Sequence, residues 1–312
     1  MQSGVIMSET NSKNALCAEK GFSEALRGLL MSEGLLRACG AELVITDPQK
    51  KAFLEKAKTL MAEIEKSVPK SDHGLFKGTV GASNIITYSN ALMALAYLAL
   101  GPRRDAEKLL AKLEDEKIIP KGDHGLFGNG YNSKKEYVYA NAAMALAYFA
   151  AGRRQDAENL LIKLDDKSIM PRGKHGLFCE GSEDKDECTY CNTPMVLLYL
   201  ALGRRQDAEA LLKKVEKVIP KSTNGMFKNS PSITSNVTIY TNAPMALAYL
   251  ALGRRQDAEE LLEKIEKAIP RGSHGLFGES SEDNDECTYD NALMVLVYCA
   301  LAGIGAFGSV MP

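Results

Sequence analysis

Two acidic loops gather carboxylate side chains that can do acid/base chemistry. One loop holds Glu180, Glu183, Asp184, Asp186 and Glu187, and the other holds Glu279, Glu282, Asp283, Asp285 and Glu286. Carboxylate pairs serve as general acids and bases, and glycoside hydrolysis uses two of them about 5–9.5 Å apart. The loops therefore indicate a carboxylate pair or a bound cation, or else solvated acidic loops retained from a duplication.

Asp290 is the acid that the scaffold explains least. It stands inside a Tyr-x-Asn motif that occurs five times, and the other copies have Ser89, Ala140, Cys191 and Thr241 at its position. A carboxylate at a helix start can act as acid, base or sugar ligand. The alternative is a first-turn acid that the helix dipole favours. We predict Asp290, Glu286 and Glu187 as catalytic residues.

The repeated Tyr and Asn residues admit two interpretations. The simpler one is a structural ring in which Tyr packs between repeats and Asn satisfies the helix start or a neighbouring loop. The other is a bowl whose tyrosines stack against a sugar or an apolar ligand. On the second interpretation the substrate-binding residues are Tyr88, Tyr139, Tyr190, Tyr240, Tyr289 and Asn291.

The histidines and cysteines carry weaker signals. His73, His124, His175 and His274 occupy equivalent positions, which indicates groups that lock a loop rather than converging metal ligands. Cys188 and Cys191 could join Cys179 or Cys287 on a zinc ion, but small, buried and reduced cysteines explain them more simply. We find no phosphate-binding glycine loop, Gly-x-Ser-x-Gly elbow or His-Glu-x-x-His motif. The prediction is no metal and no cofactor.

These residues sit in a sequence repeat of about fifty residues. A His/Asn-Gly-Leu/Met-Phe tetrad starts at residues 73, 124, 175, 224 and 274. Each tetrad precedes a variable polar loop, the Tyr-x-Asn motif, an apolar helix and a glycine. An Arg-Arg segment then opens an amphipathic helix that a proline ends. A fixed period of this length predicts stacked helical hairpins.

The pattern predicts an all-α, α/α toroid as one domain over residues 21–312, after a flexible tail over residues 1–20. The buried helices form the inner ring, and a degenerate sixth inner or capping helix is expected over residues 22–39. An outer helix over residues 48–67 should begin at Asp47 and Pro48. An open α-solenoid is the alternative, but the apolar C-terminal segment lacks the polar cap that an open stack needs.

A toroid gathers the variable loops and the inner-helix N-termini at one mouth. Loops on a rigid scaffold carry binding residues, and helix N-termini present unpaired N–H groups. In a ring of six with inner helices about 9 Å apart, copies three and five lie about 16 Å apart. Inward side chains would shorten that distance toward the separation of a carboxylate pair.

Two strings of the repeat resemble the helical hairpins of six-hairpin (α/α)-barrel glycosidases. The first is Thr288-Tyr-Asp-Asn-Ala-Leu-Met, which an apolar helix follows, and the second is Gly-Arg-Arg-Gln-Asp-Ala-Glu-x-Leu-Leu. The Gly-Leu-Phe loops are similar to Gly-Gly-Phe segments of terpenoid-cyclase and protein-prenyltransferase toroids. The resemblance implies a toroid with its active site at one mouth, and carbohydrate or polyprenyl chemistry. The Asp-x-Asp-Asp motif of the cyclases is missing from this chain.

Composition narrows the function classes. The formal net charge of −2 argues against nucleic acid or an anionic membrane as a partner. The first twenty residues lack the pattern of a secretory signal, so a cytoplasmic location is expected. The leading hypothesis is a glycoside hydrolase or lyase acting on an oligosaccharide or another small molecule in the central bowl. The alternatives are a non-catalytic helical-repeat binding protein and a terpenoid-cyclase-like or prenyltransferase-like protein.

Overall fold

The computed structural model describes residues 47–100, 103–231 and 237–304. The tail predicted over residues 1–20 and the helix predicted over residues 22–39 lie outside these described residues. Ten helices occur in the described part of the chain. They alternate between helices that are buried on all sides and helices that bury a single face.

Five inner helices are almost wholly buried because apolar side chains surround their axes. The inner helices are α3 (Thr87–Leu100), α5 (Val138–Ala150), α7 (Thr189–Ala201), α9 (Ile239–Ala251) and α11 (Thr288–Leu301). The outer helices, with one buried stripe each, are α2 (Pro48–Ser67), α4 (Arg103–Leu113), α6 (Arg154–Asp165), α8 (Arg205–Val218) and α10 (Arg255–Ala268).

The helix boundaries follow the local signals in the sequence. The side chain of Asp47 accepts a hydrogen bond from the backbone N–H of Gln49 at 2.9 Å, so α2 begins where the capping residue predicts. Gly152, Gly203 and Gly253 have positive φ angles of 85°, 84° and 79° directly after inner helices. That left-handed conformation ends each inner helix and allows the chain to turn into the outer one.

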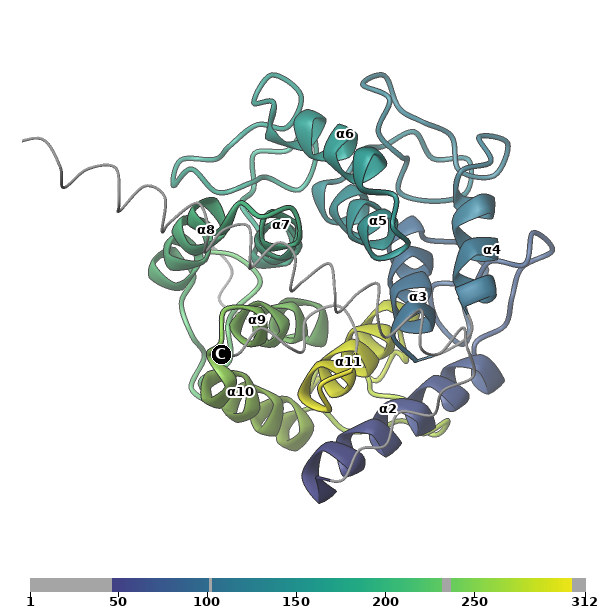
Figure 1. The fold of residues 1–312 in the computed structure, drawn as a ribbon, viewed down its shortest axis with the longest axis vertical. Helices are drawn as coiled ribbons and strands as arrows, with labels where there is room; N and C mark the ends of the chain where they lie inside the picture. Colours follow the sequence, from purple (N-terminus) through teal and green to yellow (C-terminus); the bar gives the residue numbers. More distant parts are fainter. Residues whose placement is uncertain (1–46, 101–102, 232–236, 305–312) are drawn as a thin grey trace, which may run out of the picture.

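The inner helices form a closed circle. Each packs against the next along the chain, and α11 packs directly against α3 (Figure 1). The N-terminal helix α2 packs mainly against α11, so one hairpin of the ring is assembled from the two ends of the described chain. The predicted toroid is confirmed, and the open solenoid is not needed. Because α3 and α11 are in contact, the described circle closes with five inner helices.

Hydrogen bonds to the loops also join the last repeat to the first. The backbone N–H of Thr288 donates to the carbonyl of Gly78 at 2.8 Å, and its hydroxyl donates to the carbonyl of Lys77 at 2.6 Å. Thr87 and Thr189 make equivalent hydroxyl bonds to Gly128 and Lys228. Each loop is therefore fixed to the inner helix of the neighbouring repeat, including the pair that joins copy five to copy one.

The centre of the ring is packed with side chains. Residues of all five inner helices meet on the axis, among them Leu92, Leu146, Leu197, Leu247 and Leu296. They leave a void of about 10 Å³, roughly the space of one water-sized probe. The apolar central cavity that the terpenoid and prenyl-transfer alternative requires is absent from these described helices.

Candidate functional site

The recurring Asn fastens the tetrad loop to the inner helix. Asn291 accepts a hydrogen bond from the backbone N–H of Phe277 at 2.8 Å and donates to the carbonyls of Phe277 and Cys287. The equivalent Asn of the other four repeats binds its Phe in the same way. All five are fully buried. Asn291, predicted to bind substrate, is placed in this loop anchor and is not exposed to the mouth.

Glu187 and Glu286 each hold a tetrad loop in place. One oxygen of Glu187 accepts from the backbone N–H groups of His175 and Leu177 at 2.9 and 3.0 Å, and the other lies 2.5 Å from Nδ1 of His175. Glu286 pairs with His274 in the same way, and Glu136, in a loop that is not acid-rich, pairs with His124. His124, His175 and His274 therefore lock loops as the sequence indicated, whereas copy one has Ile85 at the Glu position opposite His73. The two glutamates predicted as catalytic sit in separate, structurally occupied positions.

Most of the remaining loop acids point to solvent. Glu183, Asp186, Glu282, Asp283 and Asp285 are exposed. A groove of about 980 Å³ runs along the acidic loop that holds Glu183 and Asp186. It lies beside these exposed side chains and away from the axis of the ring. These exposed carboxylates match the solvated acidic loops that the sequence also allowed.

The five tyrosines of the Tyr-x-Asn motif form a closed aromatic ring at the mouth. The centroids of neighbouring rings lie 5.1–6.0 Å apart, and the circle runs from Tyr88 through Tyr139, Tyr190 and Tyr240 to Tyr289 and back to Tyr88. Edge-to-face contacts at such distances stabilise aromatic pairs. Above this floor lies a cavity of about 230 Å³, which we call the tyrosine bowl. The tyrosines thus pack as a structural ring and also line the bowl.

A second set of residues forms the rim of the bowl, two positions after the Phe of each tetrad. Asn129 and Asn229 hydrogen-bond to the hydroxyls of Tyr139 and Tyr240 at 3.1 and 2.8 Å. The hydroxyl of Tyr289 donates to Glu279 at 3.3 Å. In copy one the rim residue is Gly78. The buried hydroxyl of Tyr88 accordingly has no hydrogen-bond partner among the described residues.

Glu180 and Glu279 are the two carboxylates that line the tyrosine bowl. Burial raises the pKa of both groups, and the nearby acids Asp184 and Asp283 add to the shift in Glu180 and Glu279 respectively. In the sequence these two residues stand out only as part of the loop charge. Their position reads Gly78, Asn129, Glu180, Asn229 and Glu279 across the copies, which is the same kind of variation that singled out Asp290.

Asp290 lies behind the tyrosine ring and does not reach the bowl surface. It is fully buried, and neither carboxylate oxygen has a side-chain hydrogen-bond partner in the described structure. Burial, together with the charge of Glu279, raises the pKa of Asp290 well above its ordinary value, and the backbone of Tyr240 opposes the shift. The structure therefore brings Asp290 next to Glu279 while keeping it away from Glu187.

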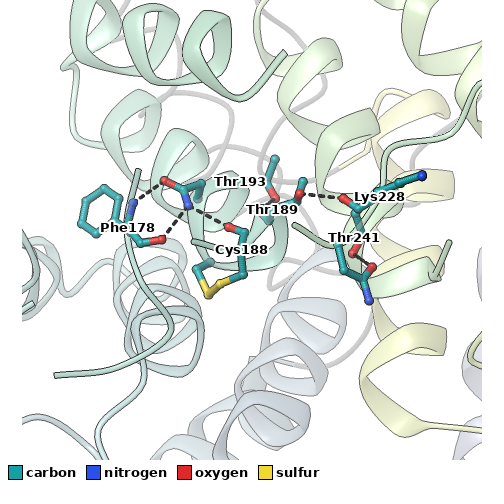
Figure 2. Close-up of a disulfide and its surroundings, with 9 residues drawn as sticks. Phe178, Cys188, Thr189, Thr193, Lys228 and Thr241 are labelled. Carbon is teal, nitrogen blue, oxygen red and sulfur yellow. Dashed lines mark hydrogen bonds between the residues drawn. A yellow bond between two sulfur atoms is a disulfide. The ribbon is translucent and has the colours of Figure 1, made fainter. Parts of the chain in front are cut away.

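Cys188 and Cys191 form a disulfide at the start of α7 (Figure 2), which corrects the prediction of reduced thiols for this pair. Their Cα atoms are 5.4 Å apart, within the range that a disulfide needs. The sequence placed both residues on an apolar helix. It did not show that Cys188, at the N-cap, turns its side chain toward the first turn. Cys179 and Cys287 are buried free cysteines, and Cys299 is buried as well.

No protein-family model and no curated protein matches the sequence. The described helices include none that is long and apolar enough to cross a membrane.

Several solved structures share the fold. A GH76 α-mannanase from Bacteroides thetaiotaomicron is 12% identical, with a TM-score of 0.54 over 80% of this chain and 95% of that chain. An endo-β-1,4-glucanase from Acetobacter xylinum is 14% identical, with a TM-score of 0.53 over 78% and 97%. An inactive variant of a GH76 α-1,6-mannanase from Salegentibacter sp., in complex with α-1,6-mannotriose, is 13% identical, with a TM-score of 0.51 over 80% and 99%. The chain therefore has the toroid fold of (α/α)-barrel glycosidases.

Proposed function

We propose that this protein is a carbohydrate-active toroid that binds a saccharide in the tyrosine bowl. The observation that carries the proposal is the bowl itself, with five tyrosines as its floor and Glu180 and Glu279 on its rim. Aromatic faces stack on sugar rings, and carboxylates accept hydrogen bonds from sugar hydroxyls. The bowl volume is below the 300–1,000 Å³ of pockets for drug-sized ligands, which suits one end of a glycan rather than a long chain.

The first candidate activity is glycoside hydrolysis, with Glu180 and Glu279 as the two carboxylates. A glycosidase needs one carboxyl group that is protonated near its working pH and can donate to the leaving oxygen. Burial raises the pKa of both Glu180 and Glu279, so each fits this role on that ground, and we assign it to Glu180. The GH76 α-1,6-mannanase that shares the fold binds α-1,6-mannotriose, and this supports a saccharide as the ligand. Asp290, Glu187 and Glu286 would support the bowl from behind rather than touch the sugar.

The second candidate is a non-catalytic saccharide-binding protein. Glu187 and Glu286 favour this candidate because both bind backbone N–H groups of the tetrad loops. Neither carboxylate is then free to act on a substrate. It is also favoured by the near-equivalence of the five repeats, because catalysis usually requires different groups on the two sides of the scissile bond. Binding without turnover would be its signature.

The test combines calorimetric binding and product analysis on the full chain with α-1,6-mannan, β-1,4-glucan and starch oligosaccharides. Tyr190→Ala should weaken binding by about 2–10-fold, since an aromatic contact contributes about 0.5–1.5 kcal/mol. Glu180→Gln should abolish turnover and keep binding. The exposed Glu183→Gln is the matched control and should change neither.

Hydrolysis by the wild type should decline as pH rises through the raised pKa of Glu180, because the general acid must be protonated. The Glu180→Gln variant should lose that dependence. Binding of no oligosaccharide, or binding that Tyr190→Ala leaves unchanged, would refute the site. Binding with no turnover would refute the hydrolase and leave the binding protein.

A further inference from the structure

In copies four and five, three positions of the repeat bring their side chains together beneath the rim of the bowl. They are the rim residue, the residue two before the motif Tyr, and the residue directly after that Tyr. In copy four they are Asn229, Thr238 and Thr241. The hydroxyl of Thr241 donates to Oδ1 of Asn229 at 2.6 Å, and the hydroxyl of Thr238 lies 3.1 Å from that oxygen and 3.0 Å from the Thr241 hydroxyl. The fold therefore closes these positions into a triangle.

Copy three fills the same triangle with Glu180, Cys188 and Cys191. The two cysteines satisfy each other by forming the disulfide (Figure 2). The side chains at these positions are therefore satisfied in two ways. Copy three uses a covalent bond between its cysteines, and copy four uses hydrogen bonds.

Copy five fills the triangle with Glu279, Cys287 and Asp290, each 99 positions after its counterpart in copy three. These three residues can form neither the disulfide of copy three nor the hydroxyl bonds of copy four. The thiol of Cys287 lies 3.5 Å from Oε2 of Glu279, and both oxygens of the fully buried Asp290 lack a side-chain hydrogen-bond partner in the described structure. One ligand atom from each of the three residues lies within 4.8 Å of the other two. A buried carboxylate without a partner is costly, so this triangle lacks a component that the other two have.

We propose that Glu279, Cys287 and Asp290 bind a divalent transition-metal ion of the zinc type. A positive ion at the centre of the triangle supplies the missing partner of Asp290. One thiolate and two carboxylates suit zinc, whereas calcium and magnesium select sites made of oxygen atoms alone. Three protein ligands leave a fourth tetrahedral position for water or a ligand atom.

The distances between the three donor atoms suit a tetrahedral metal ion once the side chains move slightly closer together. Ligand bonds of about 2.0–2.3 Å put tetrahedral donors roughly 3.5 Å apart, which is closer than the 4.8 Å limit within which the three donor atoms lie. Side-chain rotation supplies this difference because Glu279 is only partly buried. Metal binding would displace the thiol proton of Cys287 onto water, since the thiolate is the form that ligates.

The site stands apart from the proposed saccharide function, although Glu279 belongs to both. A metal-bound Glu279 leaves Glu180 as the single free carboxylate at the bowl. Occupancy would therefore favour the saccharide-binding candidate over a hydrolase with two free carboxylates.

The test is a titration of the chelator-treated full chain with Co²⁺, without reductant so that the disulfide stays closed. One equivalent should produce a sulfur-to-cobalt charge-transfer band, and Zn²⁺ should displace it. Cys287→Thr and Asp290→Thr introduce the residue type that copy four carries at these positions, so the fold accepts them. Each should remove the band or weaken Zn²⁺ binding by about 100-fold or more, because loss of a ligand exceeds the 10–100-fold effect of outer partners. Cys179→Ala, which removes a buried cysteine outside the triangle, should leave the band unchanged.

No thiolate band in the wild type, or a band that survives in Cys287→Thr, would overturn the proposal. If the wild type binds no metal and Asp290→Thr is more stable than the wild type, Asp290 is held as an uncharged carboxylic acid. Neither readout involves a saccharide, so this proposal and the proposed function can fail separately.

Discussion

Nδ1 of His175 lies 2.5 Å from the carboxylate of Glu187, while the other oxygen of that carboxylate receives two backbone N–H groups of the tetrad loop. Glu187 is 5% exposed. This pairing explains why a His at the start of the tetrad accompanies a Glu twelve residues later in copies two, three and five. Copy four has Asn224 and Val237 at these positions, so both members of the pair are replaced there, whereas copy one keeps His73 with Ile85 at the Glu position.

Removing this carboxylate should destabilise the protein. Glu187→Ala leaves the N–H groups of His175 and Leu177 without a partner in a buried loop. We expect a loss of about 2–4 kcal/mol in the free energy of unfolding, measured by urea denaturation. Glu183→Ala, in the exposed part of the same loop, should stay within about 0.5 kcal/mol of wild type. A Glu187→Ala variant as stable as the control would contradict the structural role and restore Glu187 as a catalytic candidate.

Ring closure predicts that the first and last outer helices are equally important. Leu60 of α2 and Leu261 of α10 occupy equivalent buried stripes, at 0% and 4% exposure. In a closed ring Leu60→Ala and Leu261→Ala should each cost about 2–5 kcal/mol, because both create a cavity against an inner helix.

The two variants are compared by chemical denaturation under identical conditions. In an open stack α2 would be a terminal helix, and Leu60→Ala would then cost far less than Leu261→Ala. A single cooperative transition for both variants would indicate that the ends of the described chain unfold together with the ring.

The tyrosine ring offers a comparison between two hydroxyls. The hydroxyl of Tyr240 is bonded to Asn229 at 2.8 Å, whereas the buried hydroxyl of Tyr88 faces no partner in the described chain. Tyr240→Phe should therefore cost about 1 kcal/mol or more, since the Asn229 amide loses its acceptor. Tyr88→Phe removes an unsatisfied polar group and should be neutral or stabilising. Thermal denaturation measures both, and a larger loss for Tyr88→Phe would reveal a partner such as bound water.

The disulfide should contribute modestly to stability. Linking Cys188 to Cys191 closes a very short loop, which in the chain-entropy model corresponds to roughly 2 kcal/mol. Addition of a reductant should lower Tm by a few degrees and make the two thiols reactive to alkylation after unfolding. Cys188→Thr/Cys191→Thr, which introduces the hydroxyls of copy four, should retain the fold and lose all sensitivity to reductant. A reductant effect that persists in this variant would place the sensitive bond elsewhere.

The sequence by itself determined the helices and their order. The glycine after each inner helix, the proline after each outer one and the Asp47 cap act through local backbone preferences, so they can be recognised without tertiary information. The fifty-residue period also predicted a stack of hairpins, and the nearly all-apolar inner helices favoured a closed ring over an open stack. The equivalence of the histidines indicated a loop lock, because converging ligands would differ between copies, and this holds for His124, His175 and His274.

Only the tertiary structure decided which acids face the mouth. Alternate positions around a loop point to opposite sides, and a few residues separate Glu180, at the bowl, from Glu187, in the His175 clamp. The direct contact of α11 with α3 also depends on how the helices pack, and no local signal specifies it. The triangle of Glu279, Cys287 and Asp290 forms because a loop folds back over the start of its own helix. Residues up to eleven positions apart thereby meet, which the linear spacing does not reveal.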